Sequence, residues 1–289
     1  MGLIEKQMNY HHTYHAGNFA DVVKHIILIE LLTYLKNKPT PFCYIDTHAG
    51  SAYHDLFSEF AVKNKEYLNG IEKIIQQEQP PAYIKRYLDC IHQINSQLAH
   101  TNYSSLRYYP GSSMIAHYFM RPQDRIIACE HNPPVYQSLK LAWINYKQVS
   151  IHHMDGYLAL KAFTPPREQR GLVLIDPSFE HPDEFKHIAL ALPSVFKRWR
   201  NAMVMIWYPI KEKFQVERFH RTIRQLIKQP ILVNELSIFP DLHQHLNGCG
   251  IIVINPPWKL DQSLNKIYSW LWKTLSINHQ GQYRSYLLK

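Results

Sequence analysis

Seven short apolar runs narrow the possible folds of this chain more than any other feature of its sequence. Each run ends at a polar or turn-forming residue, and helical segments separate most of them. The runs are Phe42–Asp46, Ile126–Glu130, Ser150–Asp155, Leu172–Asp176, Ala202–Trp207, Leu236–Phe239 and Gly250–Asn255. Strands that alternate with helices form a largely parallel sheet with helices packed on it. The pattern predicts an α/β fold with a seven-stranded, mostly parallel sheet.

Four of these runs end on a carboxylate, namely Asp46, Glu130, Asp155 and Asp176. Ligands of doubly wound sheets bind at the C-terminal ends of the strands. A carboxylate there accepts hydrogen bonds from ribose hydroxyls or from an adenine amino group, although a single Asp commonly does no more than cap the next helix. Four such ends in succession favour a nucleotide cofactor.

The first two runs are about 80 residues apart, far more than one crossover helix needs. Residues 54–105 are rich in Lys, Glu, Gln, Ile, Leu and Tyr with helical periodicity. They predict a helical insertion, and hence a division into a main domain of residues 1–53 and 106–289 and an inserted helical subdomain of residues 54–105. A further amphipathic helix is expected from Asn18, a plausible N-cap, to Lys36.

The run that ends at Asp176 continues as Asp176-Pro177-Ser178-Phe179. This resembles the (Asp/Asn/Ser)-Pro-Pro-(Tyr/Phe/Trp) motif of methyltransferases that act on exocyclic amino groups. The amino lone pair of adenine is delocalised into the ring, so an acceptor for its protons helps the nitrogen to attack. Asp176 and the Pro177 carbonyl are predicted to accept these protons, and Phe179 to stack on an extruded base. Ser178 departs from the motif but removes neither acceptor.

A second match, Asn255-Pro256-Pro257-Trp258, is the better one as a string of letters. It follows the seventh run, however, which is antiparallel in this fold class, so its end should face away from the cofactor. We interpret it as a structural turn. By the same order of strands, Asp46 and His48 are expected near the amino-acid end of the cofactor, and Gly50 is expected to let the backbone approach it. Glu130 is expected at its ribose, and Asp155 and Gly156 at its adenine.

The N-terminal stretch from Tyr10 to Asn18 is dense in His and aromatic residues, and the chain carries 18 His in all. Their spacing matches no standard zinc pattern, so rings that stack on bases are the favoured interpretation and no metal is expected. The formal net charge is +9, and a basic cluster lies between Lys197 and Lys228. Phosphate binding and an ordinary solvated face both account for such a cluster.

Four cysteines lie far apart with no CxxC pair, which argues for buried reduced thiols. The longest apolar runs are far shorter than the ~20 residues that span a bilayer. Met1 is followed by no basic-then-apolar signal pattern. We therefore expect a cytoplasmic protein with no membrane association.

Six segments of the chain, in order, resemble a single family. They are Tyr10–His25, Asp46–Gly50 (DTHAG), Arg107–Ser113 (RYYPGSS), Leu172–Pro177 (LVLIDP), Ile206–Pro209 (IWYP) and Ile254–Leu260 (INPPWKL). The family is that of the bacterial 23S ribosomal RNA adenine-N6-methyltransferases, the RlmJ family, and the resemblance covers nearly the whole chain. It implies a Rossmann-like class I methyltransferase that moves a methyl group from S-adenosylmethionine to N6 of one adenine in 23S ribosomal RNA.

The resemblance also implies roles for individual residues. Asp176 would be the catalytic acceptor, beside Pro177 and Phe179. Tyr10 would contact the RNA, with help from His12. The cofactor would be bound by His25, His48, Ser112, Glu130, Asp155, Gly156 and Asp176, with Lys24 nearby. No obligate protein partner is indicated, and a monomer is expected.

Two other functions remain open from the residues alone. A DNA adenine-N6 methyltransferase would share the chemistry of Asp176 and Pro177. A non-catalytic nucleic-acid-binding protein, linked to the use of external DNA, is suggested only by Ser178. The four carboxylate strand ends argue against this last alternative, because a pure binder needs no nucleotide-cofactor site.

Overall fold

The computed structural model describes residues 12–99, 106–239 and 246–288. Within these residues, eight strands form one sheet in the order β10-β8-β9-β7-β6-β1-β4-β5. The strands are β1 (Cys43–Asp46), β4 (Arg125–Glu130), β5 (Val149–His153), β6 (Gly171–Ile175), β7 (Met203–Ile210), β8 (Ile231–Ser237), β9 (Gly248–Ile254) and β10 (Gln282–Leu287). A separate pair, β2 (Tyr53–Asp55) and β3 (Tyr108–Pro110), is antiparallel.

The direction of each strand determines which edge of the sheet its end occupies. From β5 through β4, β1 and β6 to β7, neighbouring strands are parallel. Strand β9 is antiparallel to both β7 and β8, and β10 is antiparallel to β8. The sheet is therefore mostly parallel, as predicted, and β9 runs in the opposite direction to the strands beside it, as its place in the order implied.

The predicted number of seven strands is wrong by one, because β10 adds an eighth at the edge of the sheet. Its side chains are exposed or half-buried along its length, so it lacks the apolar run by which the others were found. Strand β8 was also misplaced: it begins at Ile231, five residues before the expected run. Asn234 and Glu235 interrupt its apolar pattern, yet both are buried.

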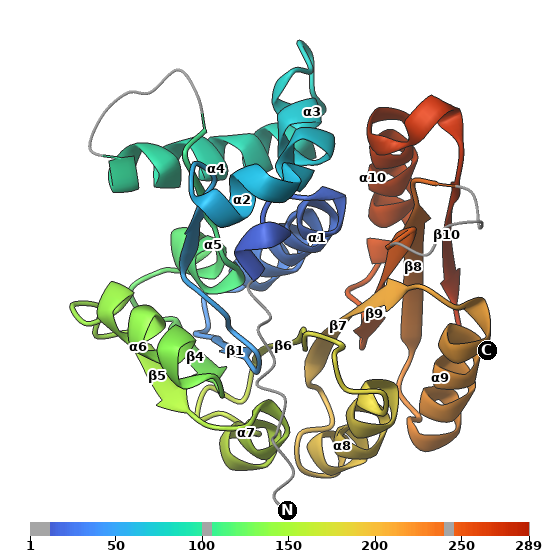
Figure 1. Cartoon of the computed structure of the whole chain (residues 1–289). Helices are drawn as coiled ribbons and strands as arrows, with labels where there is room; N and C mark the ends of the chain where they lie inside the picture. Colours follow the sequence, from blue (N-terminus) through green and yellow to red (C-terminus); the bar gives the residue numbers. More distant parts are fainter. Residues whose placement is uncertain (1–11, 100–105, 240–245, 289) are drawn as a thin grey trace, which may run out of the picture.

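Helices cover both faces of the sheet (Figure 1). One face carries α1 (Phe19–Lys36), α4 (Ala82–Ala99), α5 (Ser112–Phe119), α6 (Pro133–Ala142) and α10 (Leu260–Leu275), which share one apolar cluster. The other carries α7 (Gly156–Phe163), α8 (Glu184–Arg198) and α9 (Lys213–Leu226), which share a second. Alternate side chains of the strands supply the two clusters, as in Tyr44 and Ile45 of β1.

Helix α1 begins where the sequence predicted. Asn18 is its N-cap, and its side-chain oxygen accepts hydrogen bonds from the amides of Ala20 and Asp21. The helix is not amphipathic in the expected sense, because it is buried on nearly every side. Its residues that are not buried are Glu30, Thr33, Tyr34 and Lys36. The polar residues Asp21, Lys24 and His25 are therefore in the interior, where each needs a partner.

Residues 54–105 are largely helical, as predicted, where the structure describes them. They contain α2 (Glu59–Asn64), the 3-10 turn η2 (Glu66–Asn69), α3 (Ile71–Ile75) and α4. Ile71, Ile84 and Tyr87 belong to the same apolar cluster as α1. The segment packs on the main sheet's own core, and the division of the chain into two units stays a prediction.

This helical segment also holds the start of α1. Glu66 accepts hydrogen bonds from the His15 ring at 2.9 Å and from the side-chain amide of Asn18 at 3.0 Å. The Ile71 amide donates to the Gly17 carbonyl at 2.9 Å. A methyl group on Gly70 would lie 2.1 Å from that same carbonyl oxygen, so the backbones of the two segments are in direct contact.

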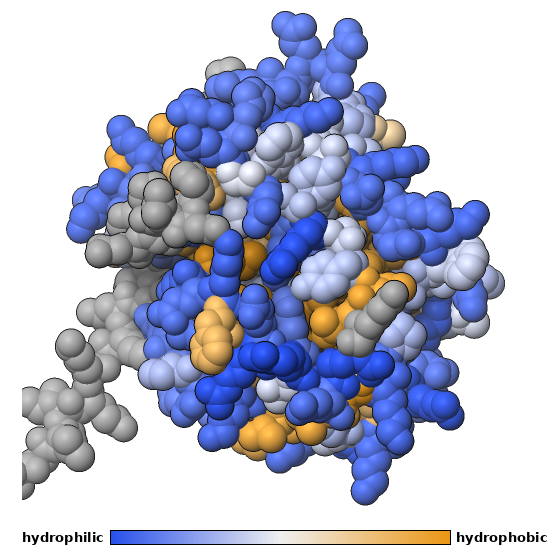
Figure 2. Space-filling view, turned by 90° about the vertical axis from the view of Figure 1, so that its right-hand side faces the viewer, coloured by the Kyte–Doolittle hydropathy of each residue, from blue (hydrophilic) through white to orange (hydrophobic). Residues whose placement is uncertain are grey.

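The remaining short elements are η1 (His12–Tyr14) and η3 (Ile277–His279). The face formed by α9, α10 and β10 is mainly hydrophilic, with scattered apolar side chains (Figure 2). This agrees with the position of β10 as an edge strand whose charged and polar residues blunt further pairing. Among the described residues, no helix has both the length and the apolar character needed to cross a membrane.

Candidate active site

The carboxylates at the strand ends lie along one edge of the sheet. Asp46 ends β1 and Glu130 ends β4, its parallel neighbour; Asp176 directly follows β6, on the other side of β1. Asp155 follows β5 by two residues and caps α7. Because the carboxyl ends of parallel strands meet at the same edge, four elements that are distant in sequence direct acidic groups into one region.

Asp176 is held by a buried lysine from α1. The Lys24 ammonium group donates to Oδ2 of Asp176 at 2.7 Å and to Oδ1 of Asp21 at 2.8 Å. The exposed fractions of these side chains are 6% for Lys24, 4% for Asp21 and 15% for Asp176. Burial by itself would lower the pKa of Lys24, but the two carboxylates more than offset it and raise that pKa above its ordinary value. The lysine is therefore charged, and it fixes one oxygen of Asp176.

Asp46 carries an unsatisfied acceptor in the interior. Its Oδ2 accepts a hydrogen bond from the Tyr44 hydroxyl at 2.8 Å. Its Oδ1 is buried and has no hydrogen-bond partner among the described residues. Burial, with the nearby charge of Asp176, raises the pKa of Asp46 to about 7, although the Tyr44 hydroxyl and Lys24 act in the opposite direction. A buried acceptor without a donor costs free energy, so this atom is free to receive a donor from a ligand.

The loop after β1 connects the strand ends to one another. The Thr47 hydroxyl donates to the Leu174 carbonyl of β6 at 2.9 Å. The Gly50 amide donates to the Glu130 carboxylate of β4 at 2.9 Å. Gly50 has a φ of +61°, and a methyl group added there would meet no atom within 4 Å. The loop thus leaves open space beside its glycine, as a backbone that approaches a cofactor requires.

His48 packs on the start of α7. A methyl group on Gly156 would lie 2.5 Å from the Thr47 carbonyl oxygen and 2.6 Å from the His48 ring, so only glycine fits. The Tyr157 ring lies edge-on to His48 with centroids 5.3 Å apart. Burial lowers the pKa of His48 to about 4, which keeps the ring neutral near pH 7. Asp155 accepts hydrogen bonds from the amides of Tyr157 and Leu158, each at 2.9 Å.

His25 joins α1 to α5 at the same edge. Its Nδ1 lies 2.8 Å from the Tyr109 hydroxyl, and its Nε2 lies 3.3 Å from the Ser112 hydroxyl. Ser112 is the first residue of α5. The structure therefore brings His25 and Ser112 together, as the resemblance implied, and adds Tyr109 between them and the buried Tyr87, 3.0 Å away.

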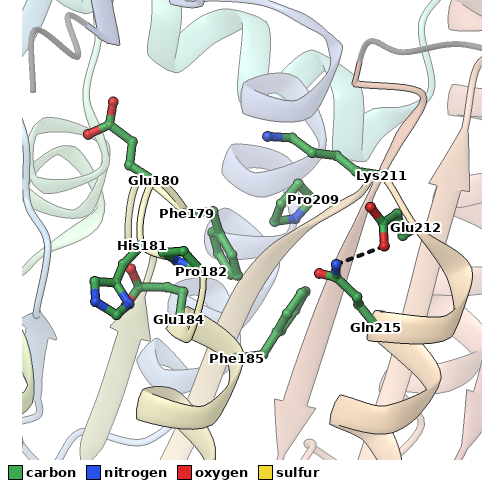
Figure 3. A pocket seen from close by; sticks show the side chains of 10 residues that line it. All are labelled: Phe179, Glu180, His181, Pro182, Glu184, Phe185, Pro209, Lys211, Glu212 and Gln215. Carbon is green, nitrogen blue, oxygen red and sulfur yellow. Dashed lines mark hydrogen bonds between the residues drawn. The ribbon is translucent and has the colours of Figure 1, made fainter.

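Phe179 lines a pocket of about 100 Å³ beside the loop that follows Asp176. Its backbone has a φ of +53°, uncommon for a non-glycine residue. Its ring lies edge-on to Phe185 and Trp207, with centroids 5.1 and 5.7 Å away. Pro182 and Pro209 add apolar walls, and acidic side chains stand at the rim (Figure 3). Pro177 is buried and Ser178 is exposed.

The second sequence match lies at the opposite edge of the sheet. Asn255 follows the end of β9, where Ile254 pairs with the beginnings of β7 and β8. Its side-chain amide donates to the carbonyls of Arg200 and Ala202 at 3.0 and 2.8 Å, and its φ is +55°. Trp258 is 84% exposed. The prediction that this motif lies away from the edge that carries Asp176 is confirmed.

The basic cluster does not form one surface. Lys211 precedes α9 at the edge that carries Asp176, whereas Arg224 lies in the last turn of α9, about 20 Å away at the opposite edge. Arg198 donates to the carbonyls of Leu160 and Lys161, so it closes the C-terminal end of α7. Only part of the cluster is thus placed to meet a substrate at the catalytic edge.

Two predicted RNA contacts cannot be followed. Tyr10 lies outside the described residues, as does the side chain of His12. Among the residues that the structure does describe, no group of three or more His, Cys, Asp or Glu side chains is arranged to hold a metal ion.

The sequence prediction missed Asp21 and Tyr109, which the structure places in contact with Lys24 and His25. One signal for Asp21 was available: it stands three residues before Lys24 in the same helix, and residues at this spacing face one another. Tyr109 lies 84 residues after His25, and no local pattern connects them.

Comparison with known proteins agrees with this geometry. Residues 39–288 match the model of a protein family described as "Ribosomal RNA large subunit methyltransferase D, RlmJ". The chain belongs to this family. The predicted family and the predicted enzyme class, an rRNA methyltransferase, are thereby confirmed.

Relatives and a solved structure extend the match over most of the chain. The Ribosomal RNA large subunit methyltransferase J of Escherichia coli K12 is 36% identical over 91% of this chain and 92% of its own. That of Haemophilus influenzae is 38% identical over 93% of this chain and 94% of its own. A crystal structure of a Legionella pneumophila protein superposes with a TM-score of 0.85 at 34% identity, over 94% of this chain and 98% of the other. The similarity to these RlmJ-family relatives and to the Legionella structure therefore extends over nearly all of the chain.

Proposed function

We propose that this RlmJ-family protein transfers a methyl group from S-adenosylmethionine to N6 of an adenine in 23S ribosomal RNA. The observation that carries the proposal is Asp176, which stands at the carboxyl end of a central parallel strand with one oxygen fixed by Lys24. Its other oxygen, Oδ1, is thereby left to accept a proton from an amino group. Family membership supports the methyltransferase reaction, and the strand ends support a nucleotide cofactor.

The residues at the strand ends suit S-adenosylmethionine. Asp46 offers a buried acceptor without a donor, which fits the ammonium group of the cofactor's amino acid. The open space beside Gly50 fits a close approach of the loop backbone. Glu130 and Asp155 would hold the ribose and the adenine, and His25, His48 and Ser112 would complete the enclosure. When bound, the cofactor supplies a sulfonium-activated methyl group.

The chain's own contribution to the transfer would be position and charge. Asp176 and the Pro177 carbonyl would accept hydrogen bonds from the two amino protons, which favours a tetrahedral nitrogen. Lys24 would keep the Asp176 carboxylate in one orientation before the substrate arrives. Acceptors that are in place beforehand need no reorganisation during the reaction, which is the usual source of such acceleration. Phe179 would hold the extruded base by stacking.

The partner implied by this function is 23S ribosomal RNA, the substrate class that the family description names as large-subunit ribosomal RNA. Lys211 and the segment that carries Tyr10 and His12 would contact it. A monomeric state and a cytoplasmic location stay predictions.

Methyl transfer from labelled S-adenosylmethionine tests the proposal. The acceptors are 23S RNA fragments, DNA of matched sequence and no nucleic acid, with wild type beside Asp176→Ala. Label on N6 of an RNA adenine, absent with the variant, is the expected result. Digestion of the RNA to nucleosides identifies the methylated atom.

Other outcomes contradict parts of the proposal separately. Label on DNA alone would make this a DNA adenine methyltransferase. Near-normal transfer by Asp176→Ala would remove Asp176 from the catalytic role. Neither label nor cofactor binding by calorimetry would favour a protein that binds nucleic acid without modifying it.

A further inference from the structure

Asp21 shares the ammonium group that holds the catalytic carboxylate. Lys24 donates to Asp21 at 2.8 Å and to Asp176 at 2.7 Å, so one buried cation lies between two carboxylates. The other oxygen of Asp21, Oδ2, accepts a hydrogen bond from the Gly17 amide at 3.1 Å. Asp21 has an exposed fraction of 4%, so its charge is little screened by water.

The position of Asp21 in the helix does not by itself require a carboxylate. It stands in the first turn of α1, where an acidic residue favours the helix dipole. The amides of that turn, however, are already capped by Asn18, which bonds Ala20 and Asp21. A neutral Asn at position 21 has one acceptor oxygen, which can still accept from Lys24, while its amide group replaces the oxygen that accepts from Gly17. Only Asp supplies a second negative charge on Lys24.

We infer that Asp21 is a positioning residue for the methyl transfer, which acts through Lys24 on the catalytic carboxylate Asp176. The inference rests on the proposed function, because it assigns Asp21 a part in that reaction. Asp21 touches neither substrate in this scheme. It provides half of the counter-charge for Lys24, so that the ammonium group orients Asp176 without neutralising the site.

The charge balance of the reaction gives Asp21 its effect. As the new bond forms between the methyl carbon and N6, the bond from that carbon to sulfur would break and the positive charge would move from sulfur to N6. N6 would then give one proton to Oδ1 of Asp176, which passes it on to solvent. Two carboxylates and one ammonium group carry a net charge of −1, which favours a cation at N6. Without the charge of Asp21 the cluster is neutral, and Lys24 is paired with Asp176 alone. Asp176 then lies in a less negative cluster, and its ion pair with Lys24 is stronger.

The test replaces Asp21 by Asn, which removes the charge at nearly constant shape and exchanges the oxygen that accepts from Gly17 for an amide group. For Asp21→Asn we expect the single-turnover rate of methyl transfer to fall about tenfold, because the cluster loses the charge that favours a cation at N6. The Kd for S-adenosylmethionine should stay within about twofold to threefold of wild type. Asn18→Ala is the matched control, since it weakens the same helical turn but leaves all three charges. It should lower Tm and leave the rate unchanged below the melting range.

A stability measurement tests the same link without turnover. Asp21→Asn and Asp176→Asn each leave Lys24 with one carboxylate, whereas the double variant leaves a buried ammonium group with none. The double variant should therefore lose more Tm than the sum of the two single losses. Lys24→Met should remove this excess.

The results separate the two proposals. Failure of the wild type to label RNA defeats the proposed function, while the Tm cycle still reports on Asp21. A wild-type transfer rate for Asp21→Asn overturns the inference, as does a loss that Asn18→Ala reproduces. Additive Tm losses would show that Lys24 does not link the two carboxylates.

Discussion

Two four-residue motifs of the same pattern follow strands of this sheet, and the fold places them at opposite edges. Asp176-Pro177-Ser178-Phe179 follows β6 at the edge where the carboxylates gather. Asn255-Pro256-Pro257-Trp258 follows β9, which is antiparallel to β7, and lies at the other edge. The motif that matches the methyltransferase pattern less well is thus at the edge where the carboxylates gather. The direction of the strand, which decides where the side chains meet, is thus more informative than the letters of the motif.

The two edges also differ in how they satisfy their polar groups. At the edge of Asp176, a buried lysine bridges two carboxylates, and Oδ1 of Asp46 has no donor within the described part of the chain. At the edge of Asn255, the side-chain amide is paired with two backbone carbonyls. The first arrangement costs stability and leaves groups free for a ligand, whereas the second contributes to stability and leaves little to bind. Substitutions at the first edge should therefore change activity, and those at the second should change stability.

The largest expected effect is on transfer by Asp176→Asn. The amide keeps the size of the carboxylate but loses the charge that favours a cation at N6, so we expect the rate to fall about a thousandfold. The measurement is label incorporated into 23S RNA under single-turnover conditions. Asn255→Ala is the comparison, and it should transfer at the wild-type rate. A comparable loss in both variants would end the distinction between the two edges.

Asp46→Asn should make the protein more stable at neutral pH. In wild type the pKa of Asp46 is raised to about 7, so the folded state retains a proton that the unfolded state has released. The contribution of Asp46 to the free energy of unfolding of the wild type therefore falls by about 2–4 kcal/mol as the pH rises from about 4 to 7. The variant lacks this loss, and its advantage in Tm should be present at pH 8 and absent at pH 4.

The contribution of His48 to stability changes with pH in the opposite direction, so it must be measured apart from that of Asp46. Its pKa is lowered to about 4, so the unfolded state binds the proton first and stability is lost as the pH falls below about 6.5. His48→Gln should flatten that part of the wild-type curve. An advantage of Asp46→Asn that did not change with pH would contradict the raised pKa of Asp46.

Much of the edge that carries Asp176 was predictable, because the direction of each strand decides at which edge of the sheet its last residue lies. Once the parallel strands were recognised, Asp46, Glu130 and Asp176 had to end near one another. Lys24 and His25 were found only through the family resemblance, since nothing local marks a buried Lys as functional. Asp21 was missed because its importance comes from Asp176, which is 155 positions later in the chain.

Strands β8 and β10 show why part of the fold was not predictable. Asn234 and Glu235 break the apolar run of β8, and their partners come from other strands. Ser285 of β10 donates to Asn234 at 2.7 Å, while Tyr208 of β7 donates to Glu235 at 2.8 Å. Arg284 of β10 also pairs with Glu235. In a sequence, polar residues within an apolar run indicate a turn unless the strand that supplies their hydrogen bonds is known. Strand β8 could therefore not be predicted without β10.

Phe179 and Trp258 occupy the same place in the two motifs and sharpen the comparison further. Loss of base stacking costs about 1–3 kcal/mol, so Phe179→Ala should slow transfer about tenfold to hundredfold. Trp258 is 84% exposed at the other edge, and Trp258→Ala should leave transfer unchanged. Initial rates over a range of RNA concentrations measure both. Equal losses would mean that the RNA reaches across both edges, and no loss for Phe179→Ala would remove its stacking role.

The smallest expected effect belongs to the Asn255 side chain and concerns stability alone. Asn255→Ala removes two hydrogen bonds, to the carbonyls of Arg200 and Ala202, and places a residue without a polar side chain at a φ of +55°. Asn tolerates this left-handed conformation better than Ala does. We expect the free energy of unfolding to fall by about 1–2 kcal/mol, measured by urea denaturation. Asn255→Gly is the discriminating variant: it relieves the backbone strain but restores neither bond. If it recovered the whole loss, Asn255 would be retained for its backbone conformation, and the carbonyls of Arg200 and Ala202 would be satisfied by water.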